Sequence, residues 1–161
     1  MNANAILALA VGIGIVAGLR AMTAPVIVSW AAYLGWLNLQ GSPLSFMGSI
    51  VAAIIFSLAA IGEYINDKLP KTPGRTAPPQ LIARIIMGGL SGACLCASAG
   101  MSLLIGALLG GIGAVIGTYG GYLARTRLVK AFDIKDIFVA IPEDLIAISL
   151  AFFLVSLPGM L

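Results

Sequence analysis

One basic side chain lies deep in an apolar stretch of the chain, and its position points to chemistry. Arg20 belongs to the segment Gly18–Pro25, which interrupts an apolar run from Ile6 to about Leu37. A charge within hydrocarbon is costly and by default marks a functional site. A guanidinium there binds an anionic group of a substrate or pairs with a carboxylate. The alternatives are a purely structural ion pair and a side chain that reaches up to the membrane surface.

The same segment is where a helix is expected to break. Pro25 has no N–H, so the carbonyl of Ala21 loses its helical partner, and Gly18 adds backbone freedom. Arg20, Thr23 and the freed backbone groups therefore meet at membrane depth. We predict a substrate-binding site lined by Arg20 and Thr23, either on one tilted helix or on two half-helices joined at the break.

Carboxylates on later segments are candidate charge or proton partners of Arg20. Glu63 and Asp67 are four residues apart, so they share one face of a helix. We assign Glu63 to the substrate-binding site and expect Asp67 in a salt bridge at the membrane surface. The sequence Pro142-Glu143-Asp144 is typical of a helix start, or it is a second break that draws Glu143 into the membrane. Glu143 completes the predicted substrate-binding set.

Other basic residues are expected at the edge of the membrane rather than within it. Arg125 and Arg127 belong to a basic strip that follows an apolar segment, and Arg84 lies near the start of another. Such residues set the topology and bind anionic lipid headgroups. We predict that Arg84, Arg125 and Arg127 contact a lipid or a phosphate.

Composition places the chain in a membrane. It has 161 residues, of which 60% are hydrophobic and 9% charged, whereas a soluble domain carries about 25% charged residues. The absence of histidine excludes histidine-based catalysis and histidine metal sites. Cys94 and Cys96 are too few for a disulfide framework or a zinc site. No nucleophile–base pair, phosphate-binding loop or metal-ligand cluster is visible, so we expect no enzyme activity, no cofactor, no metal and no nucleic-acid partner.

Five apolar segments are long enough to cross a bilayer, which takes about 20 helical residues. These segments predict an all-α, polytopic membrane helix bundle that forms a single transmembrane domain over residues 1–161. Its first helix is broken near Gly18–Pro25. The segments are residues 6–36, 46–66, 80–99, 103–123 and 137–157.

The basic residues predict how the bundle is oriented. Residues 67–80 and 124–136, with Arg84 at the membrane edge, hold eight of the nine basic residues. The positive-inside rule then gives a multi-pass protein with a cytoplasmic N-terminus. A re-entrant first segment would change the number of spans without moving the basic segments.

A short motif occurs twice. Gly12–Gly18 is similar to Gly111–Gly117, and an arginine and a threonine follow each copy. Because five through-going spans would make the first and fourth run in opposite directions, the pattern predicts an inverted repeat, with halves at 4–68 and 103–157. The alternative is chance similarity, since glycine and β-branched residues dominate membrane helices.

Motifs spread over most of the chain resemble a family of small bacterial multi-spanning membrane proteins known as a domain of unknown function. This resemblance implies an inner-membrane location and supplies no substrate or mechanism. It is carried by residues 18–25 and 63–73, by Gly120-Gly-Tyr122 with Arg125, and by Glu143-Asp-Leu145.

We therefore predict a small transporter or channel for a small, anionic solute, embedded in membrane lipid. A homodimer is expected, because five short helices can hardly enclose a pathway and the glycine-rich third and fourth spans offer faces for a partner. Two alternatives stay open. One is an enzyme or flippase acting on an anionic lipid or polyprenyl phosphate, and the other is a non-catalytic membrane assembly factor.

Overall fold

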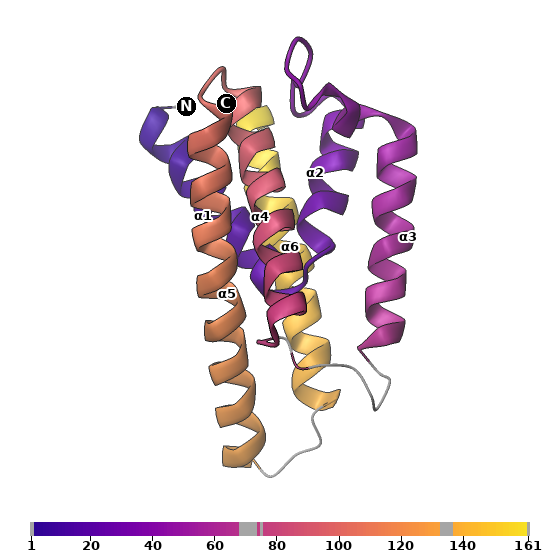
Figure 1. Ribbon diagram of the computed structural model, residues 1–161, viewed down its shortest axis with the longest axis vertical. Coiled ribbons are helices and arrows are strands. Elements are labelled where there is room, and N and C mark those ends of the chain that lie inside the picture. Colours follow the sequence, from indigo (N-terminus) through magenta and orange to yellow (C-terminus); the bar gives the residue numbers. More distant parts are fainter. Residues whose placement is uncertain (1, 68–73, 75, 133–136, 161) are drawn as a thin grey trace.

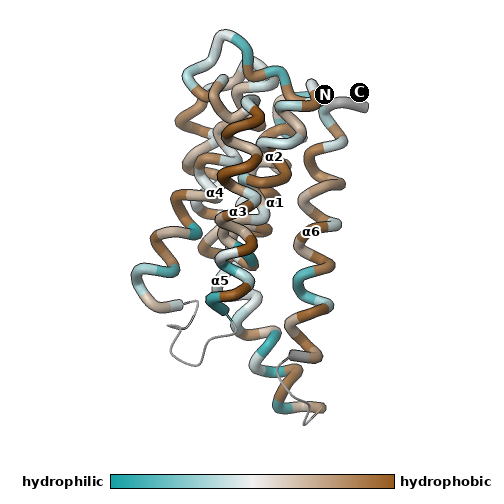
Figure 2. Tube along the Cα trace, turned by 90° about the vertical axis from the view of Figure 1, so that its right-hand side faces the viewer, coloured by the Kyte–Doolittle hydropathy of each residue, from teal (hydrophilic) through white to brown (hydrophobic). Residues whose placement is uncertain are grey.

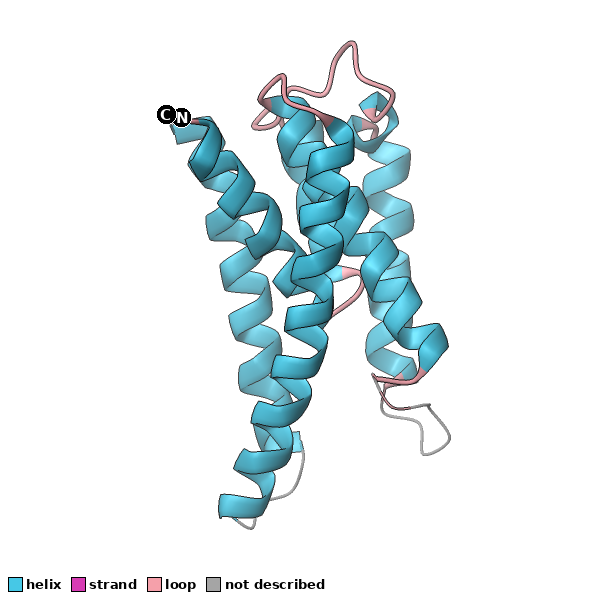
Figure 3. Cartoon of the chain, turned by 60° about the vertical axis from the view of Figure 1, so that its left-hand side comes forward, coloured by secondary structure: helices cyan, strands magenta, loops and turns pink. Residues whose placement is uncertain are grey.

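All regular secondary structure in the described part of the chain is helical (Figure 3). The computed structural model describes residues 2–67, 74, 76–132 and 137–160. It confirms the predicted all-α bundle and the break near Gly18–Pro25. The elements are α1 (Ala3–Leu19), α2 (Thr23–Tyr33), the 3-10 helix η1 (Ser45–Gly48), α3 (Ile50–Asn66), α4 (Pro78–Ser98), α5 (Leu103–Phe132) and α6 (Ile137–Met160).

Helix length and an apolar outer surface identify a membrane protein. The helices α4 and α5 and the stretch Phe138–Pro158 of α6 are long and apolar enough to cross a bilayer, and α1 and α3 are shorter apolar helices. The outward side of α3 is an apolar stripe with helical spacing that includes Val51, Leu58 and Ile65. Figure 2 shows apolar residues along the middle of the helices and polar ones mainly toward the ends. Such a surface suits hydrocarbon.

The first two helices form a re-entrant hairpin. Arg20 leaves α1 with an extended backbone, φ −140° and ψ 112°, and the chain then reverses. Gly12 of α1 packs against Leu154 of α6, while Trp36, just past α2, lies edge-on to Phe152 with ring centroids 5.4 Å apart. Both arms of the hairpin therefore lie beside the same part of α6. The chain enters and leaves on one side (Figure 1).

The other four α-helices, α3 to α6, run from one end of the bundle to the other (Figure 1). The two chain ends share one end of the bundle, whereas α3 meets α4, and α5 meets α6, at the opposite end (Figure 1). The basic residues Arg125, Arg127 and Lys130 lie toward that opposite end on α5, and Arg84 is six residues into α4. The other four basic residues of the two predicted segments fall outside the described residues. The prediction that the N-terminus shares a side with the basic segments is thus wrong, because the first segment turns back at Arg20 instead of crossing.

Glycines let α1, α4 and α5 approach backbone to backbone. Gly110 of α5 lies directly against Gly14 of α1 and Gly88 of α4, and Gly113 lies against the carbonyl of Val11. A side chain at any of these positions would overlap a neighbouring main chain. Small residues serve this purpose in lipid, where packing rather than the hydrophobic effect holds helices together.

The two similar motifs pack against each other in parallel. Gly14 contacts Gly110 and Gly18 contacts Ala114, so the numbering rises in the same direction along both helices. The opposite directions expected for an inverted repeat are wrong for α1 and α5, again because the first segment does not cross. The glycine faces of α4 and α5, which suggested a homodimer, are used within the chain.

Cysteine labelling tests the hairpin. In a background with Cys94 and Cys96 replaced by alanine, single cysteines at the exposed positions Asn4, Gln40 and Gly74 are treated with a membrane-impermeant maleimide in oriented vesicles. Asn4→Cys and Gln40→Cys should react from the same side, and Gly74→Cys from the other. Reaction of Asn4→Cys and Gly74→Cys from one side would mean that the first segment crosses the membrane.

Two glycines of α5 make a matched pair for testing the close contact. Gly113→Ala would press a methyl group into the backbone of α1, whereas Gly120→Ala meets open space. We expect Gly113→Ala to lower the stability by about 1–3 kcal/mol, as overpacking does. Gly120→Ala should leave it unchanged or raise it, because alanine is the better helix former. Thermal unfolding in detergent, followed by tryptophan fluorescence, measures both.

Candidate functional site

The tip of the hairpin exposes two helix ends inside the bundle, and each meets a charge of opposite sign. A helix start has unpaired N–H groups and a partial positive charge, and a helix end has unpaired carbonyls and a partial negative charge. At the start of α2, the N–H groups of Ala21 and Met22 donate to the two carboxylate oxygens of Glu63, each at 2.9 Å. At the end of α1, Arg84 Nη1 donates to the carbonyls of Gly18 and Leu19, each at 2.7 Å.

Arg20, between the two ends, is enclosed by carboxylates from two other helices. Its Nε and Nη2 donate to Asp144 of α6 at 2.5 and 2.9 Å, a two-pronged geometry that orients both groups. Its Nη1 donates to Asp67, at the end of α3. The ring centroid of Tyr64 lies 4.5 Å from Arg20 Cζ, which adds a cation–π contact. Only 8% of the Arg20 side chain is exposed.

The helices α3, α4, α5 and α6 all bring side chains to the tip. On α3, the spacing of four residues turns Glu63 and Asp67 to one side, where one caps α2 and the other binds Arg20. Arg84 of α4 also faces Glu63, with Nη2 3.8 Å from Oε1. Thr118 of α5 donates to its own helix at Ala114 and lies 3.3 Å from the carbonyl oxygen of Gly18. The tip is therefore fixed from every side by side chains far away in sequence.

The cluster lies inside the bundle near its basic end. Arg84 is six residues into α4, and Asp144 is seven residues into α6. At about 1.5 Å per helical residue, both lie about 10 Å along the helix from that end. This depth is within the apolar part of α6.

The hairpin cluster, which consists of Arg20, Glu63, Asp67, Arg84 and Asp144, carries two positive and three negative formal charges, a net charge of −1. Its arginines already bind carboxylates or carbonyls, so the arrangement is closed. Within the described ranges, no three acidic or cysteine side chains are placed to hold a metal ion.

The structure brings some of the predicted residues together and separates others. Arg20 and Glu63 meet at the tip, and Thr23 is buried at the first turn of α2. Glu143 does not reach Arg20, because it points to Arg125 of α5, with 3.5 Å between Nη1 and Oε2. Its neighbour Asp144 takes the predicted place, since one residue along a helix turns a side chain by about 100°.

Two expectations based on membrane depth are wrong. Asp67, expected in a surface salt bridge, binds Arg20. Arg84, expected at lipid headgroups or a phosphate, is 3% exposed and holds the end of α1. Arg125 lies at a pocket and Arg127 is exposed on α5. The sequence did hold a signal for the role of Asp67, because its spacing of four residues from Glu63 places both carboxylates on one face of the helix.

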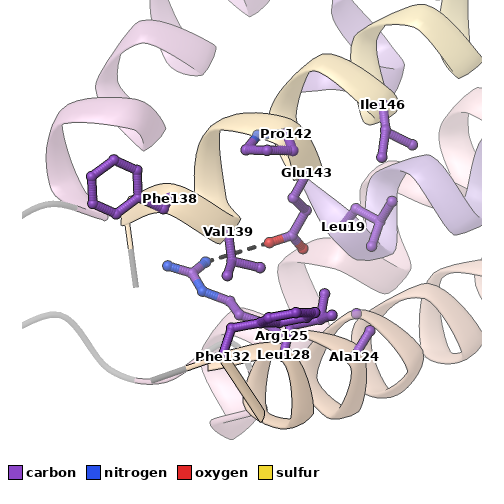
Figure 4. A pocket seen from close by; sticks show the side chains of 11 residues that line it. Leu19, Ala124, Arg125, Leu128, Phe132, Phe138, Val139, Pro142, Glu143 and Ile146 are labelled. Atoms are coloured by element: carbon purple, nitrogen blue, oxygen red, sulfur yellow. Dashed lines mark hydrogen bonds and ion pairs between the residues drawn. The ribbon is translucent and has the colours of Figure 1, made fainter. Parts of the chain in front are cut away.

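A pocket of about 360 Å³ lies beside the tip, between the end of α5 and the start of α6. Figure 4 shows apolar side chains around it and Arg125 pointing across it to Glu143. Leu19, the residue before Arg20, forms part of the wall. The lining residues are Leu19, Gly121, Ala124, Arg125, Leu128, Phe132, Phe138, Val139, Pro142, Glu143 and Ile146.

The two adjacent carboxylates of α6 provide a test of the cluster. Asp144→Ala removes a buried partner of Arg20, and breaking such a pair typically costs about 3–5 kcal/mol. Glu143→Ala should cost about 1 kcal/mol or less, because the longer contact involves Arg125, whose side chain is 24% exposed. Thermal unfolding of both variants in one detergent measures the difference. Equal losses would show that Arg20 does not depend on Asp144.

The comparisons with known proteins identify a family and add no activity. No curated protein and no solved structure matches the chain. The family model described as Domain of unknown function (DUF4126) matches residues 7–161, nearly the whole chain. The protein therefore belongs to the DUF4126 family.

Proposed function

We propose that this membrane protein is a transporter for a small anionic solute, with its site at the tip of the re-entrant hairpin. The observation that carries the proposal is that Arg20 lies between two half-helix ends within the bundle, and that its described guanidinium partners are carboxylate side chains, which can exchange. Secondary transporters build their sites at such discontinuous helices, where helix ends and charged side chains converge.

The closed cluster implies how an anion would enter. With all five groups ionised, the net charge of −1 repels an anion, and each of the three Arg20 guanidinium nitrogens already donates to a carboxylate. Protonation of one carboxylate removes its charge and releases a guanidinium donor. Asp67 is the more accessible of the two, since 30% of its side chain is exposed against 16% for Asp144. An anion then replaces Asp67 at Arg20, so that anion and proton bind together.

The orientation follows from the same geometry. The end of α5 that carries Arg125, Arg127 and Lys130 faces the cytoplasm under the positive-inside rule. The N-terminus, at the other end of the bundle, then lies outside. In a bacterial inner membrane this places the hairpin cluster in the cytoplasmic half, and the hairpin enters from the periplasmic side.

Proton-coupled flux in proteoliposomes tests the proposal. Vesicles containing a pH-sensitive dye receive a panel of inorganic and carboxylate anions at a fixed inward proton gradient. The wild-type protein should acidify the lumen with at least one anion. Arg20→Gln should reduce this rate by about tenfold or more, because a charge-assisted hydrogen bond contributes about 1.5–3 kcal/mol. Asp67→Asn, which resembles the protonated state, should carry the anion without the proton.

Two controls separate transport from a structural role. Lys130→Gln removes a charge from the side of α5 that faces away from the pocket and should transport normally. Joint replacement of Arg20 by Met and of Asp67 and Asp144 by Leu removes the ion pairs without leaving a buried charge. A folded protein that still transports after this replacement would contradict the proposal. The absence of anion-dependent acidification in the wild-type protein would also contradict it.

A further inference from the structure

The pocket between α5 and α6 lies outside the hairpin cluster, and the transport proposal does not use it. Nine of its eleven lining residues have no charge or polar side-chain group, and the other two are Arg125 and Glu143. A hydrated ion gains nothing from such walls, whereas a hydrocarbon chain does.

The pocket adjoins surface that faces lipid. Four of its lining residues are also among the exposed large apolar side chains: Leu128 at 42%, Phe132 at 67%, Phe138 at 63% and Ile146 at 60%. An apolar wall that continues into an apolar outer surface gives a lipid chain a path from the bilayer. A ligand of this pocket would therefore enter sideways from the bilayer, between α5 and α6.

Charge at the pocket favours an anionic headgroup. Arg125 crosses the pocket wall toward Glu143 at 3.5 Å, a distance longer than a close ion pair (Figure 4). Among the residues that the structure describes here, Arg125, Arg127 and Lys130 lie within six positions at this end of α5, and Glu143 is the one carboxylate that lines the pocket. Basic groups at this membrane depth attract anionic lipids.

We propose that this pocket is a binding site for an anionic phospholipid, with an acyl chain between α5 and α6 and the phosphate at Arg125. The phosphate competes with Glu143 for the guanidinium. Because Leu19 precedes Arg20 and Glu143 precedes Asp144, the bound chain also supports the wall behind the hairpin tip. This site does not depend on whether the hairpin transports an anion.

Photo-crosslinking in detergent micelles tests the site. Full-length protein is mixed with phosphatidylglycerol or phosphatidylcholine that carries a diazirine on the acyl chain, and the labelled peptides are mapped. Phosphatidylglycerol should label residues 121–132 and 138–146 more strongly than phosphatidylcholine. Arg125→Gln should reduce this labelling by about tenfold, as expected when one hydrogen bond to a charged group is lost. Glu143→Gln should increase it, because a competing carboxylate is removed.

Matched variants on α5 separate the pocket from general lipid contact. Ala124→Trp fills the pocket from an exposed position and should abolish the labelling. Leu108→Trp, on a lipid-facing position elsewhere on the helix, should leave it unchanged. Excess inorganic phosphate should not compete.

Three results would overturn the proposal: equal labelling by both lipids, wild-type labelling of Ala124→Trp, or full competition by inorganic phosphate alone. Each can be obtained whether or not the proteoliposomes transport an anion.

Discussion

A bilayer offers no water to a backbone that reverses direction inside it, and this constraint governs the structure. The turn between α1 and α2 leaves N–H groups at one helix end and carbonyls at the other, and each unpaired group in hydrocarbon costs several kcal/mol. The Glu63 carboxylate accepts hydrogen bonds from the N–H groups at the start of α2, and the Arg84 guanidinium donates to the carbonyls at the end of α1. The positions of α3 and α4 follow, since each must bring its charged side chain to the tip.

Close packing supplies the precision that these hydrogen bonds need. Gly110 meets α1 and α4 at once, so the three backbones come together without intervening side chains. The carbonyls of Gly18 and Leu19 are thereby held within reach of Arg84 and, for Gly18, near Thr118. The hydrogen bonds at the hairpin tip and the close glycine packing of α1, α4 and α5 therefore depend on each other.

Much of this arrangement could be predicted from sequence, and the failures have physical reasons. The break at Arg20 was predictable because a charge and a proline are costly in an apolar helix. That the chain then turns back was not, because hydropathy is the same for a crossing and a returning segment. Because the first segment turns back, α1 and α5 run parallel and not in the opposite directions that an inverted repeat requires. For the same reason, the N-terminus lies at the end of the bundle away from the basic residues of α5. The choice between Glu143 and Asp144 depended on helix register, which two adjacent carboxylates do not reveal.

The distance in sequence between Arg20 and its partners has a consequence for biogenesis. Asp144 follows Arg20 by 124 residues, so at about 5–20 residues per second a ribosome needs roughly 6–25 s to supply it. During this time the guanidinium has no partner from α6 and is costly to leave in lipid. Asp67, which follows Arg20 by only 47 residues, is available much earlier than Asp144. The Arg20 site is therefore completed in two stages, and its two-pronged contact forms only after the last helix has been made.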